Sequence, residues 1–119
     1  MEVRIKYGIE PDHPAYTKGV IFYDGKAVGY LILTDKELPE RNLSRILPSD
    51  SVYLTYIEIF PNFRGNGIGA QTVGKLTKDL KQKGYDYLVL EPRAEVAGWW
   101  ESMGFFPIAK DDWFLMKRL

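Results

Sequence analysis

A glycine-rich segment in the second half of the chain has the residue types and spacing that suit phosphate binding. The run Arg64-Gly65-Asn66-Gly67-Ile68-Gly69-Ala70 follows an apolar stretch and leads into a segment with helical periodicity. Glycines in such a turn leave backbone N–H groups accessible, and the N-terminus of the following helix adds about half a positive charge. The guanidinium of Arg64 could add bidentate contacts to phosphate oxygens. The alternative is a tight structural connection in which the glycines serve only capping and packing.

The same glycines also match a dinucleotide-binding pattern, Gly65-x-Gly67-x-x-Ala70, with Glu91 about twenty residues further on. Two features argue against this interpretation. In a dinucleotide-binding fold the first glycine follows the strand at once, whereas here residues 61–64 intervene. Too few residues follow Glu91 in a chain of 119 to build the remaining strands of such a sheet. We therefore favour a different phosphate-containing ligand.

The composition excludes several kinds of site. The chain has no cysteine and a single histidine, His13, which excludes disulfides, thiol nucleophiles and Cys/His zinc sites, and we expect no metal. Sixteen basic and sixteen acidic residues give a net charge of zero, which argues against a nucleic-acid partner. No apolar run approaches the roughly 18 residues of a membrane-spanning helix, and the N-terminus lacks the apolar segment of a signal peptide. We expect a cytoplasmic protein without a membrane partner.

Hydrophobic patterns predict the elements that position the glycine-rich segment. Apolar residues at helical spacing predict a helix that follows Gly69 and ends at a Gly84 cap, and a second helix is predicted over 94–103. The dipeptide Asp24-Gly25 is typical of a tight hairpin turn. The polar segment 35–48 is either a short helix near 40–47 or a loop. Strands are predicted over 2–7, 19–23, 26–34, 51–60, 85–90, 105–109 and 113–118.

The length of the chain limits the architecture. A chain of 119 residues corresponds to one domain, residues 1–119. Hydrophobic residues make up 45% of it, which is enough for one core. The predicted order of elements, β-ββ-(α)-β-α-β-α-ββ, indicates a mixed α/β fold.

Two separated motifs resemble the GNAT superfamily of acyl-CoA-dependent N-acetyltransferases. Arg64-x-x-Gly67-x-Gly69, preceded by Ile59-Phe60-Pro61, is similar to the acyl-CoA signature of that family. Trp99-Trp100-Glu101-Ser102-Met103-Gly104-Phe105 is similar to its aromatic-Tyr-Glu-x-x-Gly-Phe segment. The resemblance runs from about Lys18 to the C-terminus. It implies a GNAT fold: a twisted, mixed, mostly antiparallel central sheet, splayed around a CoA site and flanked by helices.

The resemblance also implies a site for acetyl-CoA as cosubstrate, where strand 51–60 splays away from strand 85–90. The pantetheine arm would pair with backbone groups of strand 51–60, and the pyrophosphate would rest on the amides of residues 64–70. The helix over 94–103 would lie on the far side of the cofactor. The implied cofactor-binding residues are Ile57, Ile59, Arg64, Gly65, Asn66, Gly67, Ile68, Gly69, Ala70, Arg93 and Trp100.

The implied reaction moves an acetyl group from acetyl-CoA to a primary amine. Because no cysteine can carry an acyl-enzyme, transfer would be direct, in a ternary complex. An amine must first lose a proton, and a lysine ammonium has a pKa near 10.4, so a base is needed. Glu58 is the candidate base; the alternative is that it pairs with a basic neighbour. Two positions depart from the family: Trp100, whose indole cannot titrate, stands where a tyrosine often protonates the leaving thiolate, and Arg93 replaces a frequent asparagine.

The segment that would form one wall of the amine-acceptor site is shorter than in relatives. Relatives usually carry two helices between the first strand and the hairpin, whereas Gly8–Thr17 leaves ten residues there. An open acceptor side suits a protein lysine or N-terminus better than a small buried amine, unless residues 35–48 or the second subunit of a homodimer close it. The shortening and Trp100 together motivate an alternative function, a catalytically idle acetyl-CoA-binding module with a regulatory or assembly role. A third interpretation, based on size alone, is a phage- or plasmid-type modifier of one host protein.

Overall fold

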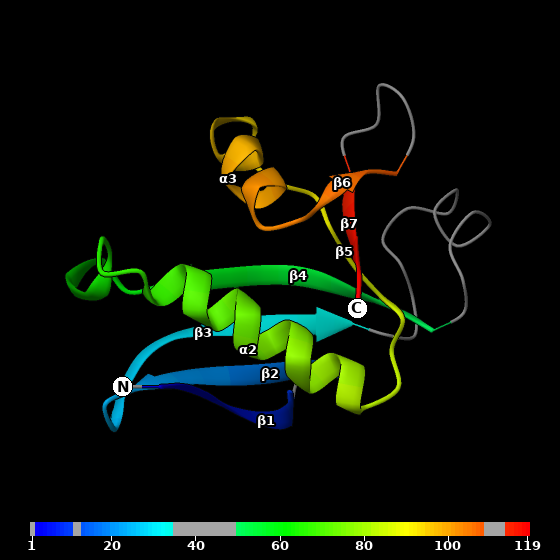
Figure 1. The fold of residues 1–119 in the computed structure, drawn as a ribbon. Coiled ribbons are helices and arrows are strands. Elements are labelled where there is room, and N and C mark those ends of the chain that lie inside the picture. The colour runs from blue at the N-terminus through cyan, green and yellow to red at the C-terminus, as the bar shows by residue number, and fades with distance from the viewer. Residues whose placement is uncertain (1, 11–12, 35–49, 109–113) are drawn as a thin grey trace.

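The computed structural model describes residues 2–10, 13–34, 50–108 and 114–119. Their strands form one sheet in the order β1-β2-β3-β4-β5-β7-β6. Figure 1 shows α2 lying across the face of β1 to β4, with α3 on the side of β5, β6 and β7. The strands are β1 (Val3–Glu10), β2 (His13–Tyr23), β3 (Lys26–Thr34), β4 (Ser51–Ile59), β5 (Tyr87–Leu90), β6 (Phe106–Pro107) and β7 (Leu115–Arg118). The helices are α2 (Ile68–Gln82) and α3 (Ala97–Ser102), with short 3-10 turns η1 (Pro61–Phe63) and η2 (Ala94–Val96).

The first three strands form a continuous antiparallel meander. Asp24 and Gly25 both have positive φ, 53° and 76°, and Tyr23 pairs with Lys26, so the predicted two-residue hairpin is confirmed. The first strand is longer than predicted, because β1 continues to Glu10 and β2 already begins at His13. Glu10 pairs with His13, so both strands extend beyond the predicted ranges 2–7 and 19–23.

The sheet splits between β4 and β5. These two strands pair in parallel only from Ser51 to Leu54 on β4, opposite Tyr87 to Leu90 on β5. On the other side of β4, Leu54 and Tyr56 pair with successive residues of β3, so the intervening Thr55 is an unpaired bulge residue. A bulge bends a strand and increases its twist, and this one lies directly after the last β4–β5 pair. The splayed, mostly antiparallel sheet expected from the resemblance is thus present.

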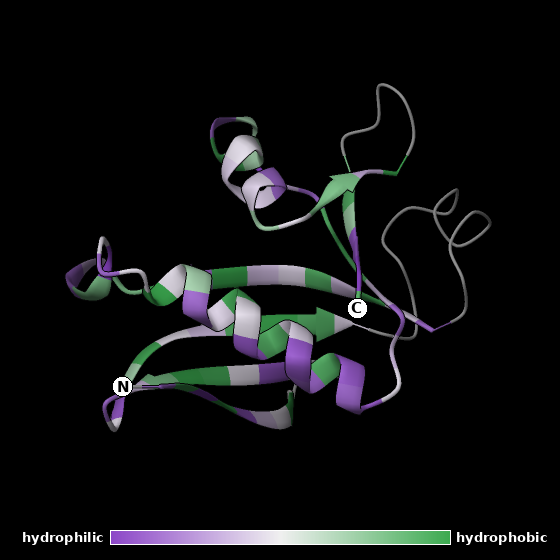
Figure 2. Cartoon of the chain, in the orientation of Figure 1, coloured by the Kyte–Doolittle hydropathy of each residue, from purple (hydrophilic) through white to green (hydrophobic). Residues whose placement is uncertain are grey.

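Helix α2 packs its apolar side on the sheet. Figure 2 shows hydrophilic colour on the outward side of its C-terminal half. The helix ends in a Schellman-type cap: Gly84, with φ 95°, donates its N–H to the Lys81 carbonyl at 3.0 Å, and Tyr85 donates to Leu80 at 3.1 Å. The predicted glycine cap is confirmed. The buried residues of α2 are Ile68, Thr72, Val73, Leu76 and Leu80.

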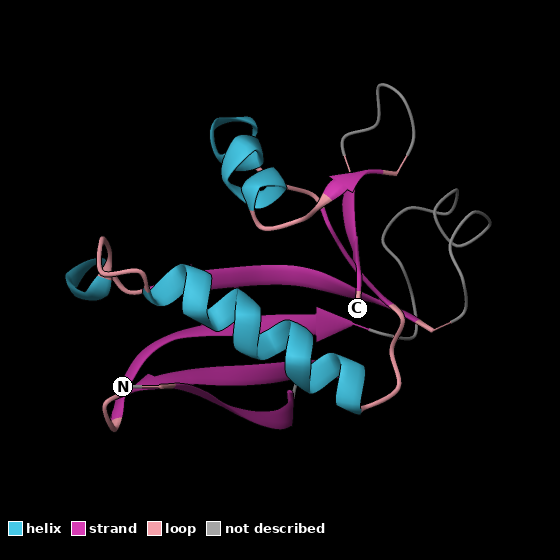
Figure 3. Cartoon of the chain, in the orientation of Figure 1, coloured by secondary structure: helices cyan, strands magenta, loops and turns pink. Residues whose placement is uncertain are grey.

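The second half of the chain is less regular than the patterns predicted, as Figure 3 shows. The predicted helix over 94–103 is η2 followed by α3, only six residues long. The predicted strand over 85–90 begins at Tyr87, because the Tyr85 amide is already used in the α2 cap. The closing hairpin is present, with strands shorter than the predicted 105–109 and 113–118.

The helix or loop predicted within 35–48 lies outside the described residues. No helix of the described parts is long and apolar enough to cross a membrane.

Candidate functional site

The split between β4 and β5 opens a groove of about 660 Å³. Residues 54–59 and Arg64 line one side, and residues 90–93, Val96, Trp99 and Trp100 line the other. The groove narrows to Leu54 and Leu90, the last residues of the two strands that still pair. The structure therefore brings the candidate base Glu58 and the expected cofactor residues of β4, η2 and α3 into one depression.

Beyond Leu54, the backbone of β4 turns polar groups toward this groove that β5 does not pair with. Phe60 donates its N–H to the Val28 carbonyl at 2.8 Å, so this N–H points toward β3. Backbone groups alternate in direction along a strand, which turns those of Ile59 and Ile57 toward the groove. The Nε of Arg64 donates to the Ile59 carbonyl at 2.7 Å. Backbone groups of Ile57 and Ile59 thus turn toward the groove, and Arg64 already engages one of the two carbonyls.

The glycine-rich turn exposes the N-terminus of α2. Gly67 is the N-cap residue, with φ 75° in the left-handed region, and no side chain of the described residues caps the helix. A Cβ added at Gly65 or Gly67 would meet no atom within 4 Å, so the backbone there is open to approach. Ile68 is buried in the core and anchors the turn. The first-turn N–H groups have no intrahelical acceptor and can serve an anion.

Glu58 and Arg64 lie close together at the end of β4. One guanidinium nitrogen of Arg64 is 3.8 Å from Glu58 Oε1. The side chain of Arg64 is 58% exposed and that of Glu58 is 32% exposed. Exposed ion pairs at such a distance contribute at most about 1 kcal/mol. The alternative role weighed for Glu58, pairing with a basic neighbour, is therefore present in the structure, but the pair is weak enough to be exchanged for another partner.

Tyrosines surround Glu58 on the sheet face away from α2. Glu58 pairs in register with Tyr30, whose ring lies 5.4 Å from that of Tyr56. Desolvation, then the neighbouring Tyr56 and the charge of Glu58, raise the pKa of Tyr30, so its hydroxyl keeps its proton at neutral pH. Tyr56 is exposed and lines the groove. Tyr53, by contrast, is buried in a small core cluster with Phe114.

Two adjacent tryptophans on α3 have different environments. Trp100 is only 6% exposed and packs edge-on against Phe105, with ring centroids 5.3 Å apart. Trp99 is 41% exposed and lines the groove. Sequence reasoning selected Trp100 from its place in the motif and missed Trp99. The pair of adjacent tryptophans was a signal, because neighbours on a helix point about 100° apart and only one can face the core. Arg93 is exposed at the groove beside the start of η2.

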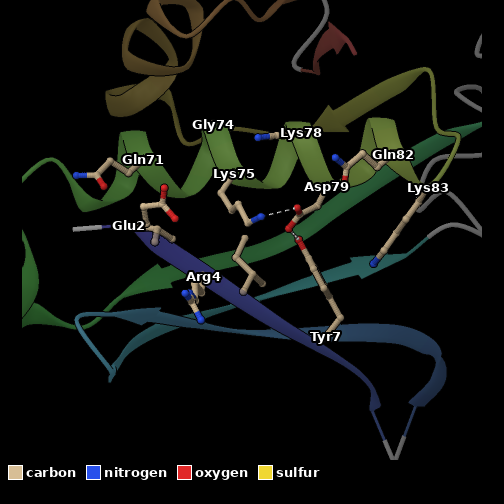
Figure 4. Close-up of a pocket in the computed structure, with 12 residues that line it drawn as sticks. Glu2, Arg4, Tyr7, Gln71, Gly74, Lys75, Lys78, Asp79, Gln82 and Lys83 are labelled. Atoms are coloured by element: carbon tan, nitrogen blue, oxygen red, sulfur yellow. Dashed lines mark hydrogen bonds and ion pairs between the residues drawn. The ribbon is translucent and has the colours of Figure 1, made fainter.

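A second depression lies on the opposite flank of α2, between that helix and β1 (Figure 4). Its centre is occupied by protein contacts: the Tyr7 hydroxyl donates to Asp79 Oδ2 at 2.9 Å, and Lys75 Nζ lies 3.0 Å from Asp79 Oδ1. Lys83 Nζ lies over the Tyr7 ring, 3.8 Å from its centroid. Burial above all, and then the hydrogen bond to Asp79 and its charge, raise the pKa of Tyr7 strongly. These contacts connect β1 to α2, and no residue of the glycine-rich turn lines this depression.

The described residues contain no group of three or more His, Cys, Asp or Glu side chains that could hold a metal ion. The β4–β5 groove offers a ligand its backbone groups, Arg64, Arg93, Glu58 and the aromatic rings.

Comparisons with known proteins agree with this geometry. The family model described as "Acetyltransferase (GNAT) family" matches residues 2–105. A GNAT family acetyltransferase from Elizabethkingia anophelis with acetyl-CoA bound superposes with a TM-score of 0.71 at 14% identity, over 99% of each chain. A candidate N-acetyltransferase from Lactobacillus plantarum gives a TM-score of 0.72 at 13% identity, over 100% of this chain and 99% of that one.

A larger structural neighbour is PaiA N-acetyltransferase from Thermoplasma acidophilum in complex with coenzyme A. It gives a TM-score of 0.63 at 15% identity and covers 88% of this chain, which spans 62% of that protein. No curated protein matches the chain in sequence. At these identities the solved structures establish the fold, and the family model establishes the family.

Proposed function

The chain belongs to the Acetyltransferase (GNAT) family, and on that premise we propose that it transfers an acetyl group from acetyl-CoA to a primary amine. The observation that carries this proposal is the early end of the β4–β5 pairing at Leu54 and Leu90. Beyond that point, the backbone of β4 faces an open groove whose lining includes Arg64 and Trp99, and the Trp99 ring lies next to Gly69 in the first turn of α2, a helix without a side-chain cap. A long ligand with an amide-containing arm and a pyrophosphate fits that sequence of features.

The pyrophosphate would bind at the glycine-rich turn. The N–H groups of residues 65–70 and the positive end of α2 favour an anion there. Arg64 adds a guanidinium at the mouth of the groove, where it can form charge-assisted hydrogen bonds to phosphate oxygens. Arg93 lies across the groove and is a second cation for the same ligand.

The pantetheine arm would extend along β4 toward the vertex of the groove, the end at Leu54 and Leu90 where β4 and β5 separate. Its amides would form hydrogen bonds with the backbone of Ile57 and Ile59, on the part of β4 that β5 does not pair with. Arg64 now donates to the Ile59 carbonyl, so its guanidinium has to move from this carbonyl for the arm to use it. Leu54, Leu90 and the edge of Trp100 supply apolar surface near the reacting end.

Glu58 is the group we propose as general base. It takes the proton as the amine nitrogen attacks the thioester carbonyl carbon, a C–N bond forms, and the C–S bond breaks. The leaving CoA thiolate then takes a proton from water, because Trp100 is a hydrogen-bond donor that does not titrate. Tyr56, exposed beside Glu58, can connect the carboxylate to solvent. Without cysteine, no acyl-enzyme on sulfur forms.

The acceptor that we propose is an amine on a protein or peptide, either a lysine side chain or an N-terminus. The paired strands β1 and β2 leave no helical wall beside the tyrosine-bearing face of the sheet within the described residues. A second subunit that covers this face would instead favour a small amine, and a homodimer remains part of the proposal to be tested by its mass in solution.

Calorimetry with acetyl-CoA, with NAD as the control ligand, is the first test. Micromolar acetyl-CoA binding without any NAD signal supports the proposal. Absence of acetyl-CoA binding would remove it, since the glycine-rich turn would then be structural.

Release of free thiol in the presence of amines tests the catalytic step. We expect thiol release that depends on a lysine-containing or free N-terminal peptide. The alternative, an idle acetyl-CoA-binding module, is favoured by the burial of Trp100 at the position of the usual acid. Such a module would bind acetyl-CoA and release no thiol with any acceptor.

A further inference from the structure

We propose that the indole of Trp99 is the stacking surface for the adenine base of acetyl-CoA. The inference rests on the proposed function for the identity of the ligand. It assigns a binding role to Trp99, the aromatic position of the motif, which is not among the cofactor-binding residues implied by the resemblance.

Trp99 has the exposure of a binding residue. It is 41% exposed and lines the groove, and Val96, one helical turn before it, is 40% exposed and lines the groove as well. The neighbouring Trp100 is buried, and its ring packs against that of Trp99 at 4.8 Å with an interplanar angle of 80°. This perpendicular contact fixes the orientation of the Trp99 ring. A large, oriented aromatic side chain therefore stands in the groove with much of its surface open to solvent.

The position of Trp99 along the groove identifies the part of the ligand it meets. A Cβ built on Gly69 would lie 3.6 Å from Cζ2 of Trp99 and 3.8 Å from Cη2. The six-membered ring of the indole thus lies against the first turn of α2, beside the proposed pyrophosphate site. In acetyl-CoA the pyrophosphate separates the adenosine from the pantetheine arm. With the arm directed along β4 to the vertex, the adenosine leaves the turn on the side of the mouth, where Trp99 is exposed.

The chemistry of this corner suits a nucleotide. Backbone N–H groups and Arg64 bind the phosphates. An aromatic face beside them can stack on the adenine base, because every base has a π-face. Replacing the indole by a methyl group should weaken binding about tenfold, within the range measured for losing one base–aromatic stack.

The test compares two ligands that differ only in the nucleotide. The wild type, Trp99→Ala and Trp99→Phe are titrated with acetyl-CoA and with S-acetyl-4′-phosphopantetheine, which lacks the adenosine together with its 5′- and 3′-phosphates. We expect Trp99→Ala to lose about tenfold in affinity for acetyl-CoA and to bind the shorter ligand as the wild type does. Trp99→Phe should restore most of the lost affinity. Equal losses for both ligands, or no loss for either, would overturn the proposal.

Phe106→Ala is the matched control. Phe106 is 43% exposed, close to the value for Trp99, but lies on β6 outside the groove. Its substitution should leave both affinities unchanged. Loss of acetyl-CoA affinity in this control would show that exposed aromatics act through general stability, and would contradict a specific role for Trp99.

Tryptophan emission gives a readout independent of affinity. Adenine stacked on the indole should quench emission in the wild type, and the quenching should disappear in Trp99→Phe although acetyl-CoA still binds. Quenching that persists in Trp99→Phe would exclude Trp99 as the platform. If the wild type binds neither ligand, the proposed function itself fails; if it binds both and Trp99 has no effect, only the present inference fails.

Discussion

Arg64 has two sets of partners that exclude one another. Its guanidinium donates to the Ile59 carbonyl and lies near Glu58, yet the proposed function needs it on phosphate oxygens. A pyrophosphate carries more charge than a half-exposed carboxylate and forms stronger charge-assisted hydrogen bonds with the guanidinium. Binding of acetyl-CoA should therefore draw Arg64 away from β4. The Ile59 carbonyl then becomes available to the arm, and Glu58 becomes available to the amine.

We predict that Arg64→Ala weakens acetyl-CoA binding by about 1–3 kcal/mol, the range for losing a hydrogen bond to a charged group. Calorimetry measures the change directly. Arg4→Ala is the control, because Arg4 lines the other depression, between β1 and α2, and its loss should not alter affinity. Unchanged affinity in Arg64→Ala would remove the phosphate role of this residue.

Glu58→Gln should separate binding from chemistry. Without the carboxylate the amine loses its base, and we expect thiol release to fall by about 10²–10⁴-fold at neutral pH. Affinity for acetyl-CoA should stay equal or rise slightly, because Arg64 loses a competing anion. Paired rate and calorimetry measurements check both effects. A variant that retains full turnover would show that water alone accepts the proton.

At the scale of elements, the turn before α2 depends on the backbone conformation of Gly67. Its φ of 75° is strained for a β-branched residue, although nothing within 4 Å would obstruct an added Cβ. We predict that Gly67→Val keeps the fold and abolishes acetyl-CoA binding, since the side chain crowds the amides and displaces the turn. Thermal unfolding and calorimetry are the measurements.

Gly74→Ala is the control for that variant. Gly74 lies within α2, and a Cβ there meets nothing within 4 Å. Alanine should stabilise the helix by about 0.5–1 kcal/mol and leave binding intact. A folded Gly67→Val protein with the affinity of the wild type would mean that the glycine-rich turn has been assigned wrongly.

The elements that could be predicted from sequence are those governed by local patterns. Apolar periodicity and Gly84 located α2, and Asp24-Gly25 located the first tight hairpin. The bulge at Thr55 could not be predicted, because it depends on how β3 and β4 pair over residues distant in sequence. The length of β1 was underestimated for a similar reason, since its last residues are held by pairing with β2.

The backbone geometry of the candidate site follows from local sequence, whereas its side-chain environments depend on packing. The positive φ of Gly65 and Gly67 agrees with the glycine composition of the turn, and the role of its amides stays a prediction. The choice between Trp99 and Trp100 depends on which ring meets Phe105 and which meets the first turn of α2. The exchangeable contact between Arg64 and Glu58 likewise depends on the path of residues 60–63, which sequence patterns do not define.

At the scale of the whole molecule, one contact joins the edge strand to the helix that carries the turn. Tyr7 and Asp79 are 72 residues apart, and their hydrogen bond connects β1 to α2 across the depression in Figure 4. Because β1 is the first strand of the sheet order, this contact stabilises the meander against the helix. Its loss should lower the stability of the whole domain without touching the β4–β5 groove.

Tyr7→Phe should cost about 1–3 kcal/mol at neutral pH, the range for losing a hydrogen bond to a charged group, and should leave acetyl-CoA affinity unchanged. Burial, with the bond to Asp79 and its charge, raises the pKa of Tyr7 above the usual value near 10. Below that pH both states keep the phenolic proton, so this group adds no pH dependence. Above it only the unfolded state loses the proton, so stability falls as pH rises.

Urea unfolding between about pH 9 and 11 reveals this linkage as the difference between the wild type and Tyr7→Phe. The wild type should lose its advantage over the variant as pH increases, because the variant has no phenol to retain its proton. Contributions that do not involve the Tyr7 hydroxyl are common to both proteins, and the comparison removes them. If the two proteins lose stability in parallel over this range, then the fold does not hold the Tyr7 proton, and the contact with Asp79 contributes little to joining β1 and α2.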